Sequence, residues 1–225
     1  ALEKVAAVLP HLENLHGLYK ILARRRSERG ALDFEGQEVK FQFDEQGQID
    51  AVKLYERNDA HRMIEECMIA ANVAAAKFLK RSRIPALYRV HPRPPTHKYE
   101  ELAEFMGTVG MPLPSYEELK PEDLMAILAR AKTRPDGALI EAVVLRSQSL
   151  ATYTADCDGH FGLALSAYAH FTSPIRRYPD LLIHRAIKAA LAGEGYSPGG
   201  GDQGWETIGM HCSQTERRAD EATRD

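Results

Sequence analysis

The sequence of 225 residues lacks any uninterrupted apolar run close to the roughly 20 residues that a membrane-spanning helix needs. The best candidate, residues 67–76, is interrupted by Asn72, and the N-terminus lacks the charged and then apolar pattern of a secretion signal. We therefore expect no contact with a membrane. The chain also begins without Met, which leads us to expect a part of a longer protein.

Cysteine is scarce as well. Cys67, Cys157 and Cys212 are odd in number and widely spaced, so they do not suggest a disulfide framework and fit a reducing, cytoplasmic location. The net charge of −3 excludes a uniformly basic nucleic-acid-binding protein but leaves room for a local basic patch. A Gly-rich phosphate loop and a Ser-His-Asp arrangement are also lacking.

Hydrophobic residues make up 44% of the chain, which excludes wholesale disorder. Their spacing predicts a mostly helical protein with a few strands, of the α+β class. Helices are expected over 2–28, 60–81, 97–109, 121–132, 137–150 and 174–192, with a last helix that reaches Asp225. A β-hairpin is expected over 38–43 and 49–55, and short strands over 86–90 and 163–167, with a loop over 151–162.

Two of the expected helices have recognisable starts. Pro10 marks either a kink in the first helix or the first turn of a second one. Asn58 or Asp59 is expected to cap the helix over 60–81.

The densest group of functional side chain types lies between residues 168 and 180. Thr172 or Ser173 is expected to cap a helix that begins with Pro174. The N-terminus of a helix presents unpaired N–H groups and a partial positive charge. This segment therefore offers a place where a phosphate can bind.

Arg176 and Arg177 would lie in the first turn of that helix, where the helix dipole disfavours cations. An anion is therefore needed nearby. It is either Asp180, four residues after Arg176, or a bound phosphate held by a guanidinium fork. The local residues alone favour neither alternative.

Charge is unevenly placed between residues 67 and 98, which contain no acidic residue. The basic residues in this stretch are Lys77, Lys80, Arg81, Arg83, Arg89, Arg93 and Lys98. The rings interleaved with them are Phe78, Tyr88, His91 and His97. A charged stretch is most often solvated surface, but this combination favours a surface that follows a nucleic-acid backbone and stacks on its bases.

A zinc site could be sought at Cys157 and His160 together with His211 and Cys212. Their spacing lacks the paired ligands of known zinc modules. Unliganded side chains are the better interpretation, and we expect no metal site in this chain.

Glu65 and Glu66 are neighbours on the helix expected over 60–81, so they point about 100° apart and only one can face inward. Glu65 lies close to Met68 and Asn72 on that helix and is expected to be the inward one. A buried carboxylate needs a partner, which slightly favours a functional role over surface solubility.

Residues 169–181 read AHFTSPIRRYPDL and are followed by His184-Arg185. This run is similar to the signature of the ribonuclease II/ribonuclease R family of exoribonucleases. The segments 57–72, 160–165 and 216–222 resemble the same catalytic (RNB) domain, so the likeness covers essentially the whole chain. The arginine pair, Phe171 and the last segment resemble the ribonuclease R branch more than the ribonuclease II branch.

The resemblance implies that residues 1–225 are the mostly helical part of that catalytic domain, without its N-terminal metal-binding part and without the flanking cold-shock and S1 domains. It also implies 3′-to-5′ hydrolysis of RNA to nucleoside 5′-monophosphates. The Mg²⁺ ligands would be aspartates that have no match here, so the chain alone is expected to be inactive. The partner would be the 3′ end of single-stranded RNA, and we expect a monomer. The alternative is a member that binds single-stranded RNA without cutting it.

Individual roles follow from the same resemblance. Arg176 resembles the catalytic residue that holds the scissile phosphate, which favours a bound phosphate over Asp180 as the anion beside the arginines. Glu65 resembles the glutamate that contacts a base or ribose near the 3′ end, and Phe34 the aromatic residue that stacks at the far end of the terminal bases. The other expected RNA-binding residues are His170, Thr172, Ser173, Arg177, Lys80, Arg81 and Arg83.

Overall fold

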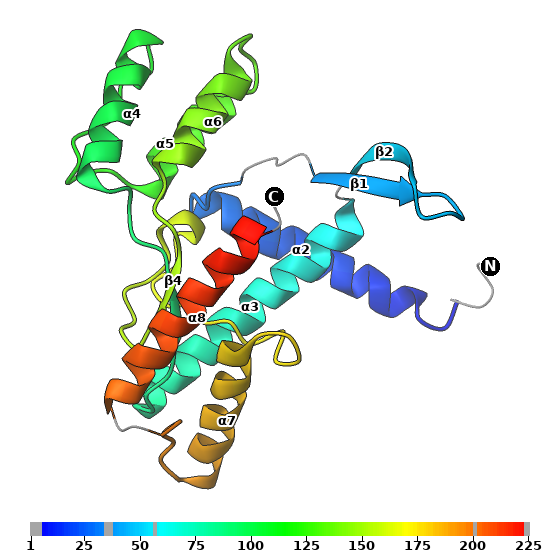
Figure 1. The fold of residues 1–225 in the computed structure, drawn as a ribbon, viewed down its shortest axis with the longest axis vertical. Coiled ribbons are helices and arrows are strands. Elements are labelled where there is room, and N and C mark those ends of the chain that lie inside the picture. The colour runs from blue at the N-terminus through cyan, green and yellow to red at the C-terminus, as the bar shows by residue number, and fades with distance from the viewer. Residues whose placement is uncertain (1–5, 34–37, 56–57, 200–201, 223–225) are drawn as a thin grey trace.

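The computed structural model describes residues 6–33, 38–55, 58–199 and 202–222 (Figure 1). The helices are α2 (Leu9–Glu28), α3 (Asp59–Ser82), α4 (Thr96–Thr108), α5 (Pro121–Ala131), α6 (Gly137–Ser147), the 3₁₀ turn η1 (Phe161–Leu163), α7 (Tyr178–Ala192) and α8 (Asp202–Ala222). The strands are β1 (Glu38–Phe43), β2 (Ile49–Tyr55), β3 (Tyr88–Val90) and β4 (Thr152–Thr154). A mostly helical chain with two small antiparallel sheets confirms the predicted α+β class.

The long helix α3 runs through the middle of the molecule and contacts α2 and α7 (Figure 1). It begins where the sequence predicts. The Asn58 side chain accepts a hydrogen bond from the backbone N–H of His61, and His61 Nδ1 accepts one from the N–H of Asn58. This reciprocal cap satisfies two N–H groups that the first turn leaves unpaired.

Two hydrophobic cores stabilise the fold. One joins α4, α5 and α6, which project together from one end of the molecule, through buried residues such as Leu102, Leu124 and Ile140 (Figure 1). The other packs α3 against α7 and the β3 strand through Leu79, Ile183 and their neighbours. The close packing of this core holds α3 and α7 in a fixed relative position.

The β1–β2 hairpin confirms another prediction. Asp44 Oδ1 accepts hydrogen bonds from the backbone N–H groups of Gln46 and Gln48, and Gly47 has a φ of +77°. A positive φ favours glycine because a side chain would clash there. The turn residues thus set where the hairpin reverses.

Helix α2 begins at Leu9 rather than at residue 2, and Pro10 lies in its first turn. Pro10 therefore lies in the first turn of a helix and does not kink one. Proline fits a first turn because the N–H groups there have no partner within the helix. Residues 1–5 lie outside the described part of the chain. No helix in the described part is long and apolar enough to cross a membrane.

Two expectations about the segment 151–167 are wrong. The predicted loop contains β4, which pairs with β3 so that Tyr153 lies opposite Arg89. The strand predicted over 163–167 is not formed, because the chain turns through η1 and only an isolated bridge joins His160 to Leu165. A three-residue strand is too short for its alternation to be recognised in a sequence.

The helix predicted to begin at Pro174 begins at Tyr178 instead, with Arg177 as its N-cap residue and Pro179 in its first turn. Residues 174–176 form a turn outside the helix. Thr172 and Ser173 therefore do not cap it, and residues 172–174 do not form the helix N-terminus at which a phosphate was expected.

Candidate functional site

The extended segment before α7 is held between two helices. Asn72 of α3 donates from Nδ2 to the Tyr168 hydroxyl at 2.9 Å and accepts from the Phe171 backbone N–H at 2.9 Å. His184 of α7 donates from Nε2 to the Phe171 carbonyl at 2.9 Å, and the two rings stack with centroids 4.2 Å apart. The backbone between Tyr168 and Phe171 is thereby fixed in place.

The turn that follows is built around Asp180, which is fully buried. Its carboxylate accepts from the Ser173 N–H at 2.7 Å and from Nε and Nη2 of Arg177 at 2.9 and 2.8 Å. Asp180 also lies in the first turn of α7, where the helix dipole favours an anion. The alternative in which Asp180 pairs with Arg176 is therefore wrong, because Arg177 takes that place.

Arg176 remains available for a ligand. It is exposed, and its side chain makes no hydrogen bond or ion pair with any residue of the described ranges. Thr172 lies in the same turn, and its buried Oγ1 has no hydrogen-bond partner within those ranges. The turn thus combines one neutralised arginine, Arg177, with one arginine whose charge is exposed.

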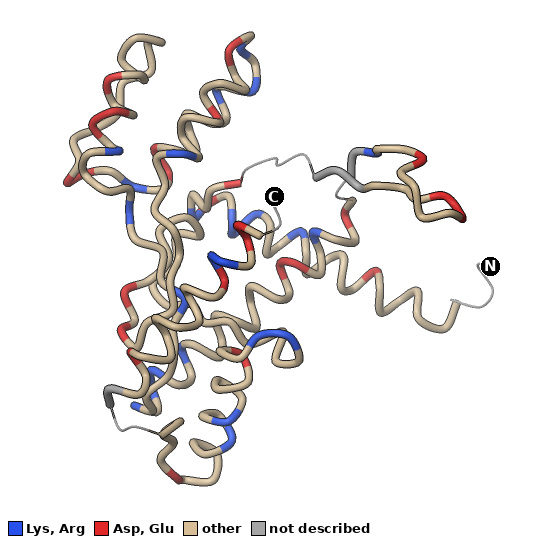
Figure 2. Tube along the Cα trace, viewed as in Figure 1, with Lys and Arg blue, Asp and Glu red and all other residues tan. Residues whose placement is uncertain are grey.

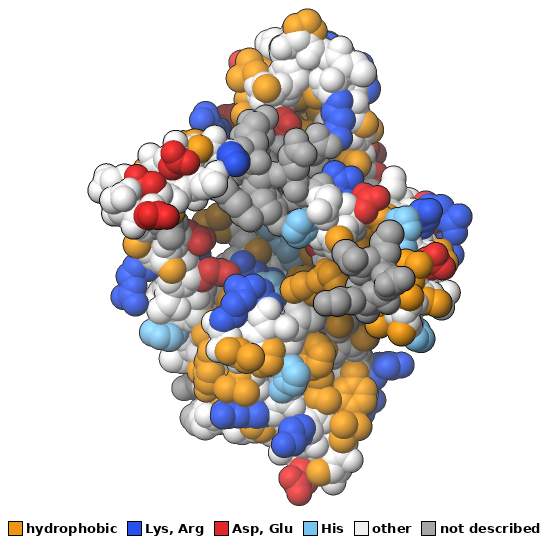
Figure 3. Space-filling model, turned by 90° about the vertical axis from the view of Figure 1, so that its right-hand side faces the viewer, with side chains coloured by type: hydrophobic (Ala, Val, Ile, Leu, Met, Phe, Trp, Pro, Cys, Tyr) orange, Lys and Arg blue, Asp and Glu red, His pale blue; other side chains and the backbone are white. Residues whose placement is uncertain are grey.

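A groove of about 570 Å³ runs between the first half of α3 and the held segment. Its walls are mainly apolar, and the side chains used below are Ile64, Glu65 and Met68 on one side and Tyr168, His170 and Arg177 on the other. Figure 3 shows a hollow near the middle of one face, where hydrophobic, histidine and basic side chains meet. Apolar walls with charged groups at the edge suit a base together with a sugar-phosphate chain.

Arg176 lies beside a second hollow of about 410 Å³. Arg177 and Tyr178 line it from the turn, and Cys212 and Glu216 line it from α8. Arg177 borders both hollows. The turn therefore separates the apolar groove from the place where the exposed guanidinium of Arg176 lies.

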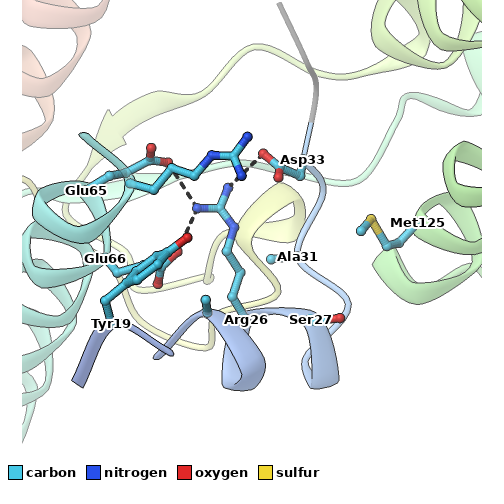
Figure 4. A pocket seen from close by; sticks show the side chains of 10 residues that line it. Tyr19, Arg26, Ser27, Ala31, Asp33, Glu65, Glu66 and Met125 are labelled. Carbon is cyan, nitrogen blue, oxygen red and sulfur yellow. Dashed lines mark hydrogen bonds and ion pairs between the residues drawn. The ribbon is translucent and has the colours of Figure 1, made fainter. Parts of the chain in front are cut away.

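Arg26 of α2 binds both glutamates of α3, as Figure 4 shows. Its Nη1 lies 3.0 Å from Glu65 Oε1 and 3.0 Å from Glu66 Oε1, and its Nη2 lies 3.6 Å from Asp33 Oδ1. The side chain of Glu66 is 8% exposed and that of Glu65 35%. The prediction that Glu65 is the inward residue is wrong, because Arg26 compensates the charge of a buried Glu66.

Glu65 lines both the groove and a cavity of about 180 Å³ around Arg26. It is therefore within reach of a ligand in the groove, although it also binds Arg26. Phe34 lies outside the described residues, directly after Asp33. Its expected stacking role stays a prediction.

The basic stretch divides into two sets. Arg89 donates to Glu216 at 2.6 Å, Arg93 to the Tyr116 carbonyl and Lys98 to the Arg146 carbonyl, so these three stabilise the fold. The other set is exposed near the C-terminal end of α3 and consists of Lys77, Lys80, Arg81 and Arg83 (Figure 2).

The aromatic part of that interpretation needs correction. Tyr88 is only 5% exposed, so it cannot stack on a base. Phe78 is partly buried and packs against the core that joins α3 and α7. His91 is bound to the Ser149 carbonyl and to the Gly162 N–H. The exposed basic set, by contrast, stays a candidate for contact with a polyanion.

The described residues do not fit a magnesium site. Within the ranges that the structure describes, no group of three histidine, cysteine, aspartate or glutamate side chains is placed to hold a metal ion. The Cys157 thiol contacts the Ser166 carbonyl, and His160 Nδ1 accepts from the Leu163 N–H. Burial lowers the pKa of His160 to about 3, so the ring is neutral.

No pattern in the sequence singles out Arg26 or Tyr153. Arg26 stands in a run of arginines at a helix end, which is typical of a solvated surface. Tyr153 lies in a segment expected to be a loop, yet its hydroxyl is 2.8 Å from His170 Nδ1. Both act through residues far away in the sequence, and only an alignment or a structure would reveal them.

Comparison with known proteins gives the family. The family model described as RNB domain matches residues 2–193. Ribonuclease R of Escherichia coli K12 is 45% identical over 232 residues, and that of Vibrio cholerae 47% over 233 residues. Each alignment covers 99% of this chain but 28% of the relative, so the chain spans little more than a quarter of these relatives.

A solved structure agrees with the sequence matches. The structure of Mycoplasma genitalium RNase R in complex with ribose methylated single-stranded RNA is similar with a TM-score of 0.87 and 29% identity. The similarity covers 96% of this chain and 35% of that protein. With a matched family model over most of its length, the chain belongs to the RNB domain family.

Proposed function

We propose that this chain is part of the catalytic domain of a 3′-to-5′ hydrolytic exoribonuclease and that its groove holds the 3′ end of single-stranded RNA. The observation that carries the proposal is the groove itself, which brings Glu65, His170 and Arg177 together, while the exposed Arg176 follows on the other side of the same turn. Support comes from the similarity to a ribonuclease R structure that contains single-stranded RNA.

The groups in the groove suit different parts of a nucleotide. The apolar side chains Ile64 and Met68 can pack against the face of a base, which is sequence-tolerant because every base has such a face. The Glu65 carboxylate can accept from a ribose 2′-hydroxyl, the group that distinguishes RNA from DNA. The groove therefore supports an RNA ligand without selecting a sequence.

Arg176 has the chemistry for the reacting phosphate. Its guanidinium is charged and carries no partner among the described residues, whereas Asp180 already neutralises Arg177. Hydrolysis adds negative charge to the phosphate oxygens in the transition state, and a guanidinium placed there lowers the barrier. The buried Asp180 keeps the turn rigid, so that Arg176 needs little reorganisation.

Release of nucleoside 5′-monophosphates would depend on Mg²⁺, and the described residues do not form its site. We propose that carboxylates elsewhere in the longer protein bind the metal.

The purified 225-residue chain is expected to bind single-stranded RNA but to release no monophosphate with Mg²⁺ or Mn²⁺. An arginine and an apolar groove hold RNA, but hard divalent cations need several oxygen ligands. The assay measures binding by fluorescence anisotropy and products from labelled RNA by chromatography. The protein encoded by the complete gene is the positive control.

Stepwise release by the chain that survives repurification would show that the whole active site lies within these residues. Binding without cleavage by the complete protein would instead support the non-catalytic alternative. Failure of the chain to bind RNA at all would contradict the proposed role of the groove.

Joint replacement of Lys80, Arg81 and Arg83 by glutamine is expected to weaken binding of unrelated RNA sequences about equally. Each lost phosphate contact reduces the slope of log affinity against log salt by about one. Lys80 lies 15 residues beyond Glu65 on α3, a distance of about 22 Å, so this effect should require an RNA of several nucleotides.

The matched control replaces three other exposed basic residues by glutamine. These are Arg130 on α5, Lys132 directly after α5, and Arg146 on α6. Both variants change the net charge equally. If the two give the same salt slope, the end of α3 is only a solvated surface.

A further inference from the structure

His170 lies in the wall of the groove between two tyrosines. The Tyr153 hydroxyl oxygen is 2.8 Å from His170 Nδ1. The Tyr153 and Tyr168 rings each meet the His170 ring nearly edge-on, with centroids 5.6 and 5.7 Å away. The imidazole is therefore held at Nδ1 by a hydrogen bond and is in contact with two tyrosine rings.

Tyr153 is itself fixed by α8 and β3. It is 6% exposed, and its backbone N–H donates to Ser213 Oγ at 2.9 Å. The Arg89 guanidinium lies 4.6 Å from the centre of the Tyr153 ring and also binds Glu216 of α8. A Cβ at Gly209 would lie 2.6 Å from the Tyr153 carbonyl oxygen, so glycine permits this close approach.

The direction of the Tyr153–His170 hydrogen bond follows from which of the two atoms carries the proton. Among the described residues, His170 Nδ1 is the sole hydrogen-bond partner of the Tyr153 hydroxyl. A buried hydroxyl without an acceptor is unfavourable, so the O–H donates to Nδ1. Burial raises the pKa of Tyr153 to about 12, and the tyrosine therefore keeps that proton.

The ring of His170 carries one proton. Burial, together with the charges of Arg177 and Arg89, lowers the pKa of His170 to about 3, so the imidazole is neutral. With Nδ1 acting as an acceptor, the proton lies on Nε2. This nitrogen makes no hydrogen bond within the described residues and is not fully enclosed by them.

We propose that Tyr153 is a positioning residue that fixes His170 as a neutral Nε2–H donor, and that His170 donates this hydrogen bond to a backbone oxygen of the RNA in the groove. The inference rests on the proposed function and specifies how His170 would contact the RNA. A neutral donor holds the sugar-phosphate chain without adding charge beside Arg176 and Arg177.

The first test observes the proton directly. Nitrogen NMR of the chain with ¹⁵N-labelled histidine distinguishes the two neutral tautomers. We expect the Nε2-protonated form for His170, and a change at Nε2 when a single-stranded oligoadenylate of roughly ten nucleotides is added. In Tyr153→Phe, which keeps the ring, the tautomer preference should be lost. A His170 ring protonated on Nδ1 in the unmodified chain would overturn the inference.

The second test measures affinity for the same oligoadenylate. Glutamine at position 170 can place an amide N–H near the position of Nε2, whereas asparagine places one near Nδ1. His170→Gln should therefore bind within about three-fold of the unmodified chain, and His170→Asn and Tyr153→Phe should each bind about three- to ten-fold more weakly. Tyr116→Phe, which removes a hydroxyl bound to the Pro94 carbonyl, is the matched control.

Thermal unfolding of each variant identifies any general loss of structure, and His170→Gln tests the donor even if Tyr153→Phe is unstable. If the unmodified chain binds RNA but the glutamine and asparagine variants bind it with equal affinity, the role of His170 Nε2 is overturned and the proposed function is not. Absence of RNA binding by the unmodified chain would overturn the proposed function and this inference together.

Discussion

Replacement of Asp180 by alanine is expected to lower the free energy of unfolding by about 3 kcal/mol. The Asp180 side chain is fully buried and accepts three hydrogen bonds, two of them from the Arg177 guanidinium and one from the Ser173 N–H. Its loss leaves a half-buried cation and a backbone N–H without an acceptor. Urea denaturation followed by circular dichroism measures the change.

Asp136→Ala is the matched control, because Asp136 also binds one arginine, Arg134, in a bidentate manner but lies near the surface. Solvent replaces those hydrogen bonds, so little change in stability is expected. An Asp180→Ala midpoint equal to that of the control would show that the turn before α7 does not depend on this carboxylate.

Elements whose ends carry local signals could be predicted from the sequence. The sequence predicts a hairpin that reverses between residues 43 and 49 and a cap at Asn58 or Asp59, and both features are made by hydrogen bonds between residues at most four apart. Such contacts depend little on the rest of the chain. The predicted ends of α4 and α5 and the C-terminal end of α7 also agree within one residue.

The start of α7 shows where local signals fail. Pro174 and Pro179 can each occupy a first turn, and Thr172-Ser173 before Pro174 is the stronger sequence pattern. The buried carboxylate of Asp180 decides the outcome, since it draws the Ser173 N–H and the Arg177 side chain into one turn. That burial is a tertiary effect with no mark in the sequence.

The hairpin shows a different limit. Alternation correctly predicts two strands, yet Phe41 and Phe43 are 53% and 61% exposed, and Val52 opposite Phe41 is 58% exposed. Period-two alternation tells which side chains share a face, but it does not tell what covers that face. Alternation of this kind usually indicates a strand with one buried face, but in this hairpin the apolar side chains of that face are exposed.

Most residues of the candidate site follow from the resemblance and not from local physics. The local residues leave a phosphate and Asp180 as equal alternatives for the anion beside the arginines, and the resemblance favours a phosphate at Arg176. The error over Glu65 and Glu66 has a clear physical cause, because Arg26, some 40 residues earlier, binds both carboxylates. Long-range ion pairs of this kind cannot be inferred from the spacing of one sequence.

Arg176→Lys in the protein encoded by the complete gene is expected to lower kcat at least about ten-fold while RNA affinity changes much less. Lysine keeps the charge but loses the planar fork that can bind two phosphate oxygens at once. Because Arg176 is exposed and makes no contact with described residues, the substitution should leave the stability of the fold unchanged.

Arg130→Lys, at an exposed site on α5, is the matched control for the same change of side chain. Single-turnover release of monophosphates from labelled RNA gives the rate, and equilibrium binding by the 225-residue chain gives the affinity. Equal rates for the Arg176 variant and the control would remove Arg176 from the reacting phosphate. A loss confined to affinity would place Arg176 on an RNA phosphate that does not react, because only contacts that strengthen in the transition state change kcat.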